Sequence, residues 1–133
     1  MPEQEQRQSG VLAVDASLVS RDPAVVKAYE KDPFVHHGKL PARTVHELAS
    51  KVGGFPSTVG AITIPTLILH GTADRLAPLA GAKMLAATIG STDKKLIPYE
   101  GLYHEILNEP EQQQVMDDMC AWLTAHMAVA AAQ

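Results

Sequence analysis

The hydrophobic pattern changes character about halfway along the chain. Before residue 60, apolar positions recur at helical spacing, whereas later they gather in short continuous runs. Residues 66–69 are leucine-rich and β-branched without alternation, which is typical of a strand buried on both faces in a parallel sheet. Residues 95–99 repeat this design, and residues 78–89 between them have helical spacing. The order strand, helix, strand predicts a right-handed parallel crossover.

Start and stop signals predict three further helices. Ser20 and Asp22 can cap a helix that has Pro23 in its first turn and stops before Pro33. A second helix is expected over residues 42–52, where Val45, Leu48, Ala49 and Val52 lie at helical spacing, with the following glycines as its cap. Residues 34–41 read as a loop, and no strand is expected in this half of the chain.

The last helix is expected from residue 110 to about residue 128. Asn108 and Glu111 have the spacing of an N-cap and its N3 partner. A buried stripe is expected on this helix, with Cys120 buried beside it and His126 exposed near the end. The stripe consists of Val115, Met119, Trp122 and Leu123. Residues after 128 read as a frayed tail, and residues 1–10 as a disordered leader.

Composition narrows the class of protein. The 133 residues are 46% hydrophobic and 20% charged, with a net charge of −4, which is ordinary for a globular domain and offers no basic surface for nucleic acid. The first ten residues are polar, unlike a signal peptide, and the apolar runs are too short to cross a bilayer. One cysteine permits no internal disulfide. We expect a cytoplasmic protein, free or attached at a membrane surface.

Each of the two predicted strands is followed by a titratable side chain. Asp74 comes after the first strand and His104 after the second. Because the carboxyl ends of parallel strands meet at one edge of a sheet, the two residues are expected to lie together. An acid beside a histidine indicates the orienting acid and the general base of a hydrolytic triad. The alternatives are a turn or helix-cap aspartate for Asp74 and a surface histidine for His104.

The other histidines are weaker candidates for a catalytic or metal-binding role. His70 is interpreted as a structural residue bonded to backbone, and the neighbours His36 and His37 point apart too readily to form a metal site. The run that begins at His104 and Glu105 is not a zinc-protease motif, because its fifth position is Asn108. These residues therefore give no convincing metal site.

No serine in the chain has the context of a nucleophile. None lies in a Gly-x-Ser-x-Gly motif or between a buried strand and a helix, and no loop forms an evident oxyanion hole. The serines are Ser9, Ser17, Ser20, Ser50, Ser57 and Ser91.

The motifs around both titratable residues resemble those of an enzyme family. Residues 69–78 read Leu-His-Gly-Thr-Ala-Asp-Arg-Leu-Ala-Pro, and residues 99–105 read Tyr-Glu-Gly-Leu-Tyr-His-Glu, followed by Asn-Glu-Pro-Glu at 108–111. Together these are similar to the end of an α/β-hydrolase. The nearest likeness is to bacterial monoacylglycerol lipases of the serine aminopeptidase and lysophospholipase-like group. Residues 20–23 and 32–41 resemble the cap region of that group, so the likeness covers roughly residues 11–126.

The resemblance implies a role for each matching residue. Asp74 corresponds to the triad acid and His104 to the triad base, and residues 15–55 correspond to the lid that shapes the acyl-chain tunnel. The resemblance implies no metal and no organic cofactor. The expected fold class is α/β, as a partial α/β-hydrolase fold with two parallel strands, flanking helices and a helical lid segment. We divide the chain into a leader (1–10), a lid segment (11–56) and the C-terminal part of the hydrolase core (57–133).

Three hypotheses follow for function. In the first, the protein is a truncated or split monoacylglycerol lipase, inactive until another segment supplies the serine and the oxyanion loop. In the second, it is a catalytically dead remnant or an interaction module that self-associates through its exposed strand edge. In the third, the same acid–base pair serves a thioesterase, lactonase or peptidase.

Overall fold

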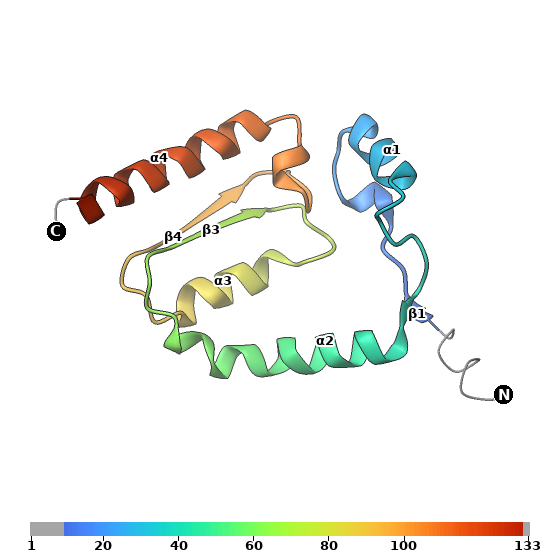
Figure 1. The fold of residues 1–133 in the computed structure, drawn as a ribbon, viewed down its shortest axis with the longest axis horizontal. Coiled ribbons are helices and arrows are strands. Elements are labelled where there is room, and N and C mark those ends of the chain that lie inside the picture. Colours follow the sequence, from blue (N-terminus) through green and yellow to red (C-terminus); the bar gives the residue numbers. More distant parts are fainter. Residues whose placement is uncertain (1–9, 132–133) are drawn as a thin grey trace.

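Two parallel strands form the centre of the structure, a computed structural model that describes residues 10–131 (Figure 1). Strand β3 (Thr66–Gly71) pairs with β4 (Lys94–Tyr99) in parallel, in a register that runs from Thr66 opposite Lys94 to Gly71 opposite Tyr99. Helix α3 (Leu79–Thr88) connects them, and α4 (Gln112–Ala131) lies on the other side of the pair (Figure 1). The predicted parallel crossover is confirmed.

The first part of the chain is mainly helical. Helix α1 (Pro23–Lys31) begins as predicted, because the Asp22 carboxylate accepts a hydrogen bond from the Ala24 N–H. Helix α2 (Ala42–Gly54) runs along the lower edge of the molecule, and α1 stands apart from the strands (Figure 1). Short 3-10 turns complete the helical elements of the described chain, namely η1 (Ala16–Leu18), η2 (Phe55–Ser57), η3 (Val59–Ala61) and η4 (Ile106–Asn108).

Two local predictions in this part are wrong. The first half does contain strands, because β1 (Gly10–Leu12) pairs antiparallel with β2 (Leu40–Pro41) inside the expected loop. Such short strands show no periodicity, so only their pairing reveals them. The glycines at the end of α2 remain right-handed, and the helix continues into η2. Among the described residues, Gly101 alone has a positive φ.

The small core lies between β4, the loop after it, and α4. Its buried centre is Tyr99, Leu102 and Val115, and four half-buried apolar side chains pack around it: Leu69, Ile97, Ile106 and Met119. Burial of β3 on both faces is only partly realised, since Ile68 and Gly71 are buried and its other residues are half-buried. Among the described residues β3 has β4 as its only partner strand, which leaves its second edge unpaired.

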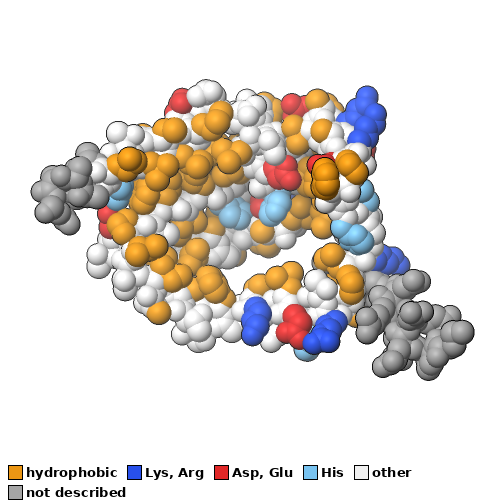
Figure 2. Space-filling view, in the orientation of Figure 1, with side chains coloured by type: hydrophobic (Ala, Val, Ile, Leu, Met, Phe, Trp, Pro, Cys, Tyr) orange, Lys and Arg blue, Asp and Glu red, His pale blue; other side chains and the backbone are white. Residues whose placement is uncertain are grey.

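Apolar side chains gather on the open face of the molecule (Figure 2). They include members of α2 and of the segment before β3, for example Val52 at 62% exposure and Ile64 at 69%. The helical spacing of α2 is therefore real, but its apolar face is largely uncovered by the described residues.

The C-terminal helix differs from its prediction at both ends. It begins at Gln112 and continues to Ala131, so residues 129–131 are helical and not frayed. Asn108 belongs to η4 and is no N-cap; its carbonyl oxygen accepts a hydrogen bond from the Ser20 hydroxyl. Within the stripe, Leu123 is 48% exposed, and Cys120 is exposed as well. His126, which was expected to be exposed, is half-buried and contacts the Trp122 carbonyl and Asp93 through its two ring nitrogens. The predicted leader lies outside the described residues except for Gly10.

Candidate active site

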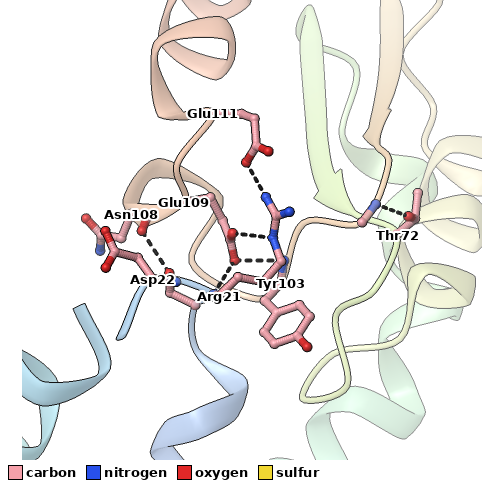
Figure 3. Close-up of polar contacts among 9 residues, drawn as sticks. Arg21, Asp22, Thr72, Tyr103, Asn108, Glu109 and Glu111 are labelled. Atoms are coloured by element: carbon pink, nitrogen blue, oxygen red, sulfur yellow. Dashed lines mark hydrogen bonds and ion pairs between the residues drawn. The ribbon is translucent and has the colours of Figure 1, made fainter. Parts of the chain in front are cut away.

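The two loops that follow β3 and β4 are joined by hydrogen bonds. The Thr72 N–H donates to the Tyr99 carbonyl over 2.9 Å, and the Ala73 N–H donates to the Leu102 carbonyl over 3.0 Å. In return, the Gly101 N–H donates to the Thr72 hydroxyl over 2.8 Å (Figure 3). These bonds fix the spacing between the loop that carries Asp74 and the loop that carries His104.

Glycine is required at two points of this junction. Gly71 ends β3 in a space so narrow that a Cβ atom would overlap the carbonyl oxygen of Leu102 and lie 2.5 Å from that of Tyr103. Gly101 turns the chain after β4 with φ 76°, a conformation that side chains disfavour. The close approach of the two loops therefore depends on residues without side chains.

Asp74 and His104 meet across the joined loops. Oδ2 of Asp74 lies 2.9 Å from Nδ1 of His104. The aspartate side chain is 4% exposed, whereas the histidine side chain is 43% exposed. The acid is thus buried behind the imidazole, and the imidazole reaches solvent.

The two interpretations of Asp74 are compatible, because each uses a different carboxylate oxygen. Oδ1 accepts hydrogen bonds from the N–H groups of Leu76 and Ala77, at 2.8 and 2.9 Å, as a turn-capping aspartate does. Oδ2 is left for His104. Burial acts to raise the pKa of Asp74, but the hydrogen bonds from Ala77, His104 and Leu76 outweigh it, so its pKa is lowered. The carboxylate stays ionised at neutral pH.

His70 lies beside this pair and is bonded to backbone, as predicted. Its Nδ1 is 2.8 Å from the Gly71 carbonyl oxygen, and its Nε2 is 3.8 Å from Oδ2 of Asp74, too far for a hydrogen bond. His36 and His37 have backbone partners and take no part in this contact. Nε2 of His37 faces the Asp32 carbonyl, and Nε2 of His36 faces the Lys39 carbonyl. Residues 10–131 contain no cluster of three or more groups placed to hold a metal.

The serine hydroxyls have other partners. Ser17 donates to Asp15, Ser20 to the Asn108 carbonyl, Ser57 to the Gly54 carbonyl and Ser91 to the Asp93 carbonyl. Ser50 is exposed on α2. Within the described part of the chain, no hydrogen bond joins a serine to His104; Ser9 falls outside it.

An apolar groove of about 520 Å³ lies between α2 and α3. Val52 and Phe55 line it from the α2 side, Met84 and Leu85 line it from α3, and His70 and Ala77 border it near Asp74. In the described residues, no helix combines the length and apolar character needed to cross a membrane.

Comparison with known proteins agrees with this geometry. The family model described as serine aminopeptidase, S33 matches residues 7–111. The chain belongs to the serine aminopeptidase S33 family.

Individual relatives of this S33 chain are lipases. It is 48% identical over 114 residues to a monoacylglycerol lipase of Mycolicibacterium smegmatis, and the match covers 86% of this chain and 41% of that enzyme. It is 34% identical to the monoglyceride lipase of Rattus norvegicus over 90% of the chain and 40% of that protein. The chain thus spans about two fifths of the length of these curated relatives.

The fold is that of part of an α/β-hydrolase. The crystal structure of Paleococcus ferrophilus monoacylglycerol lipase superposes with a TM-score of 0.80 at 28% identity, over 95% of this chain and 53% of that one. The resemblance read from the sequence motifs is confirmed for family and fold.

Sequence reasoning missed three residues of the site. Thr72 was given no role, although its hydroxyl accepts a hydrogen bond from the Gly101 N–H. Glu109 and Arg21 were given no role of their own, although Nε of Arg21 lies 2.7 Å from Oε2 of Glu109. Glu109 lies between Glu105 and Glu111 in a polar stretch of the sequence, and nothing local distinguishes it or reveals its partner.

Proposed function

We propose that this protein provides the acid, the base and one wall of the acyl pocket of a serine esterase that hydrolyses monoacylglycerols. The observation that carries this proposal is the 2.9 Å contact between Oδ2 of Asp74 and Nδ1 of His104. An ionised, buried acid on Nδ1 keeps the proton on that nitrogen and leaves the Nε2 lone pair free. Because the His104 side chain is 43% exposed, this lone pair is accessible to a nucleophile.

The reaction then follows the triad logic. A serine Oγ attacks the ester carbonyl while its proton moves to Nε2 of His104, and Asp74 stabilises the imidazolium that forms. The tetrahedral intermediate expels glycerol, which takes the proton from Nε2. Water then attacks the carbonyl of the acyl-enzyme while His104 removes its proton. The bond to the serine oxygen breaks, this oxygen takes the proton back from Nε2, and the fatty acid leaves. No step uses a metal or an organic cofactor.

The nucleophile and the oxyanion donors belong, in this proposal, to a segment other than the residues described here. Support comes from the serines of the described chain, whose bonded hydroxyls face groups other than His104. The isolated 133-residue chain is therefore inactive, and a serine-bearing segment restores it.

The substrate class is supported by two observations. The groove between α2 and α3 is lined mainly by apolar side chains and borders His70, whose Nε2 lies 3.8 Å from the Asp74 carboxylate. Such a groove suits an acyl chain whose carbonyl lies at the acid–base pair. In addition, both reported relatives are named as lipases of monoacylglycerols. Thioesters, lactones and peptides use the same pair, so a substrate panel must separate these classes.

Complementation tests the proposal. The chain is mixed with the part of the Mycolicibacterium smegmatis relative that it does not cover, and hydrolysis of a monoacylglycerol, a thioester, a lactone and a peptide is measured. We expect esterase activity in the mixture, lost in His104→Ala and retained in the control His46→Ala on α2. A fluorophosphonate probe should label only the added segment. Labelling of a serine in the isolated chain would overturn the assignment of the nucleophile.

A second candidate function, self-association, is favoured by the unpaired edge of β3 and the exposed side chains near it. Ile64 is 69% exposed, and Leu123 is 48% exposed. Exposed edges of this kind pair with other strands. Sedimentation of the isolated chain distinguishes the candidates: a dimer that Asp74→Asn leaves intact supports association, and a compact monomer argues against it.

A further inference from the structure

The largest fully buried side chain in the described structure is a carboxylate, that of Glu109. Its Oε1 accepts the backbone N–H groups of Arg21 and Tyr103 at 3.0 and 3.1 Å, and its Oε2 accepts Nε of Arg21 at 2.7 Å (Figure 3). The Arg21 guanidinium also pairs with Glu111 at the surface. The hydrolytic steps proposed above do not use this carboxylate.

The residues on both sides of His104 in the sequence are held in place by hydrogen bonds. Tyr103 precedes the histidine, and its N–H is held by Glu109. Glu105 follows it, and its N–H donates to the Val19 carbonyl over 2.8 Å. Both neighbours of His104 are therefore held, directly or through Glu109, by residues 19–21.

A third bond ties the same two segments together. The Ser20 hydroxyl donates to the Asn108 carbonyl over 2.9 Å, and it accepts the Asp22 N–H that leads into α1. Val19 and Ser20 are each 2% exposed, so this contact is shielded from water. The loop that carries His104 (residues 100–105, the histidine loop) thus lies between the segment before α1 and β3, which it touches at Gly71.

Charge explains why the contact depends on Arg21. A carboxylate removed from water is costly unless it is paired and hydrogen-bonded. The hydrogen bond that Arg21 donates to Glu109 raises the pKa of Arg21, which keeps the guanidinium charged beside the carboxylate. Glu111 bonds the same guanidinium but lies at the surface, with its side chain 45% exposed, and contacts no part of the histidine loop in the interactions described.

We propose that Glu109, neutralised by Arg21, is a positioning residue for His104, so that the Asp74–His104 contact depends on docking of residues 19–22. The catalytic meaning of this inference rests on the proposed function. The contact itself exists in the isolated chain and can be measured without activity. Glu109 touches no reacting atom; it acts by fixing the backbone on which His104 is carried.

The tautomer of His104 reports this positioning. With Asp74 on Nδ1, the neutral imidazole carries its proton on Nδ1, and without that contact the proton moves toward Nε2. Two-dimensional ¹H–¹⁵N spectra of histidine-labelled protein at about pH 8.5, above the usual range of imidazole titration, give the ratio of the two forms. Asp74→Asn is the reference variant, because it removes the acceptor on Nδ1.

Glu109→Gln should lower the ratio of the Nδ1–H to the Nε2–H form by about tenfold, the effect of losing one charge-assisted hydrogen bond. Glu111→Gln removes the other carboxylate from the same arginine and should leave the ratio unchanged. A folded Glu109→Gln protein with the wild-type ratio would overturn the proposal, since a merely structural role lowers stability without moving the tautomer. If that variant does not fold, Arg21→Gln is used in its place. We expect it to lower the tautomer ratio by less than tenfold, and an unchanged ratio would again overturn the proposal.

The same spectra separate this inference from the proposed function. If Asp74→Asn leaves the tautomer unchanged, the acid–base pair is absent and the proposed function fails. If Asp74→Asn changes the tautomer and Glu109→Gln does not, only the positioning role fails. In the complemented enzyme, Glu109→Gln should lower kcat about tenfold with KM unchanged, because His104 acts in the chemical steps.

Discussion

Nε2 of His126 lies 2.8 Å from Oδ2 of Asp93, while Nδ1 of the same ring lies 2.7 Å from the Trp122 carbonyl oxygen. Both partners are acceptors, so both ring nitrogens donate only when the imidazole is charged. The bond to the Trp122 carbonyl, followed by that to Asp93, raises the pKa of His126 despite some desolvation. The ring also stacks on Trp122 with centroids 3.8 Å apart. This contact fastens α4 to the loop before β4.

A pH-dependent contribution to stability follows. Because the folded-state pKa of His126 is raised, its contribution is fully present below the unfolded value of about 6.5 and is lost as pH rises through the folded value. His126→Gln should therefore lower Tm more at about pH 5 than at about pH 8, where the two proteins converge. His46→Gln on the exposed surface of α2 is the control. An equal loss at both pH values would contradict the charged contact.

Tyr99 should make stability fall at alkaline pH. Its hydroxyl donates to Oδ2 of Asp118 over 2.9 Å, and burial together with this carboxylate raises its pKa to about 12. Above about pH 10 the unfolded tyrosine loses its proton while the folded one keeps it, so unfolding is favoured. Tyr99→Phe should cost about 1 kcal/mol at neutral pH and flatten this alkaline decline. Denaturant unfolding from pH 7 to 11, with Tyr29→Phe as control, measures both effects.

Substitution of Gly71 should disrupt the junction of the two loops. The added methyl of Gly71→Ala meets the backbone carbonyls of Leu102 and Tyr103, which cannot move without breaking the bonds at Thr72 and Ala73. We expect a loss of more than about 3 kcal/mol in the free energy of unfolding. Gly81→Ala in α3 is the matched control, since its Cβ meets nothing within 4 Å, and it should stabilise by about 0.5–1 kcal/mol. Similar stability of the two variants would refute this account.

The two oxygens of Asp74 can be separated by mutation. Asp74→Asn keeps an acceptor for the N–H groups of Leu76 and Ala77 but cannot accept from Nδ1 of His104. In the complemented enzyme it should lower kcat by about 10³- to 10⁴-fold while Tm changes little. Asp74→Ala should lose about 1–3 kcal/mol of stability as well. Calorimetry and steady-state kinetics on both variants test this, and a fully active Asp74→Asn enzyme would exclude the orienting role.

The sequence was sufficient for the crossover and for the contact between Asp74 and His104, because both follow from local patterns and one topological rule. Short apolar runs predicted β3 and β4, and parallel strand ends meet at one edge, which brings Asp74 and His104 together. The division into leader, lid segment and core stays a prediction.

Burial and long-range polar contacts could not be predicted in the same way. Periodicity identifies the apolar face of a helix but not whether anything covers it, as the exposed Leu123 and Cys120 show. The direction of the Glu109 side chain depends on Arg21, which is 88 residues away in sequence, and no local signal encodes that partner. Likewise, β1 and β2 exist only through their mutual pairing.

The separation of these contacts along the chain also orders the folding of the molecule. The Asp74–His104 contact closes a loop of 30 residues, whereas the contact between Arg21 and Glu109 spans 88. The longer closure costs about 1 kcal/mol more in chain entropy and needs the histidine loop as its template. We therefore expect segment 19–22 to join late in folding, onto strands and helices that are already assembled.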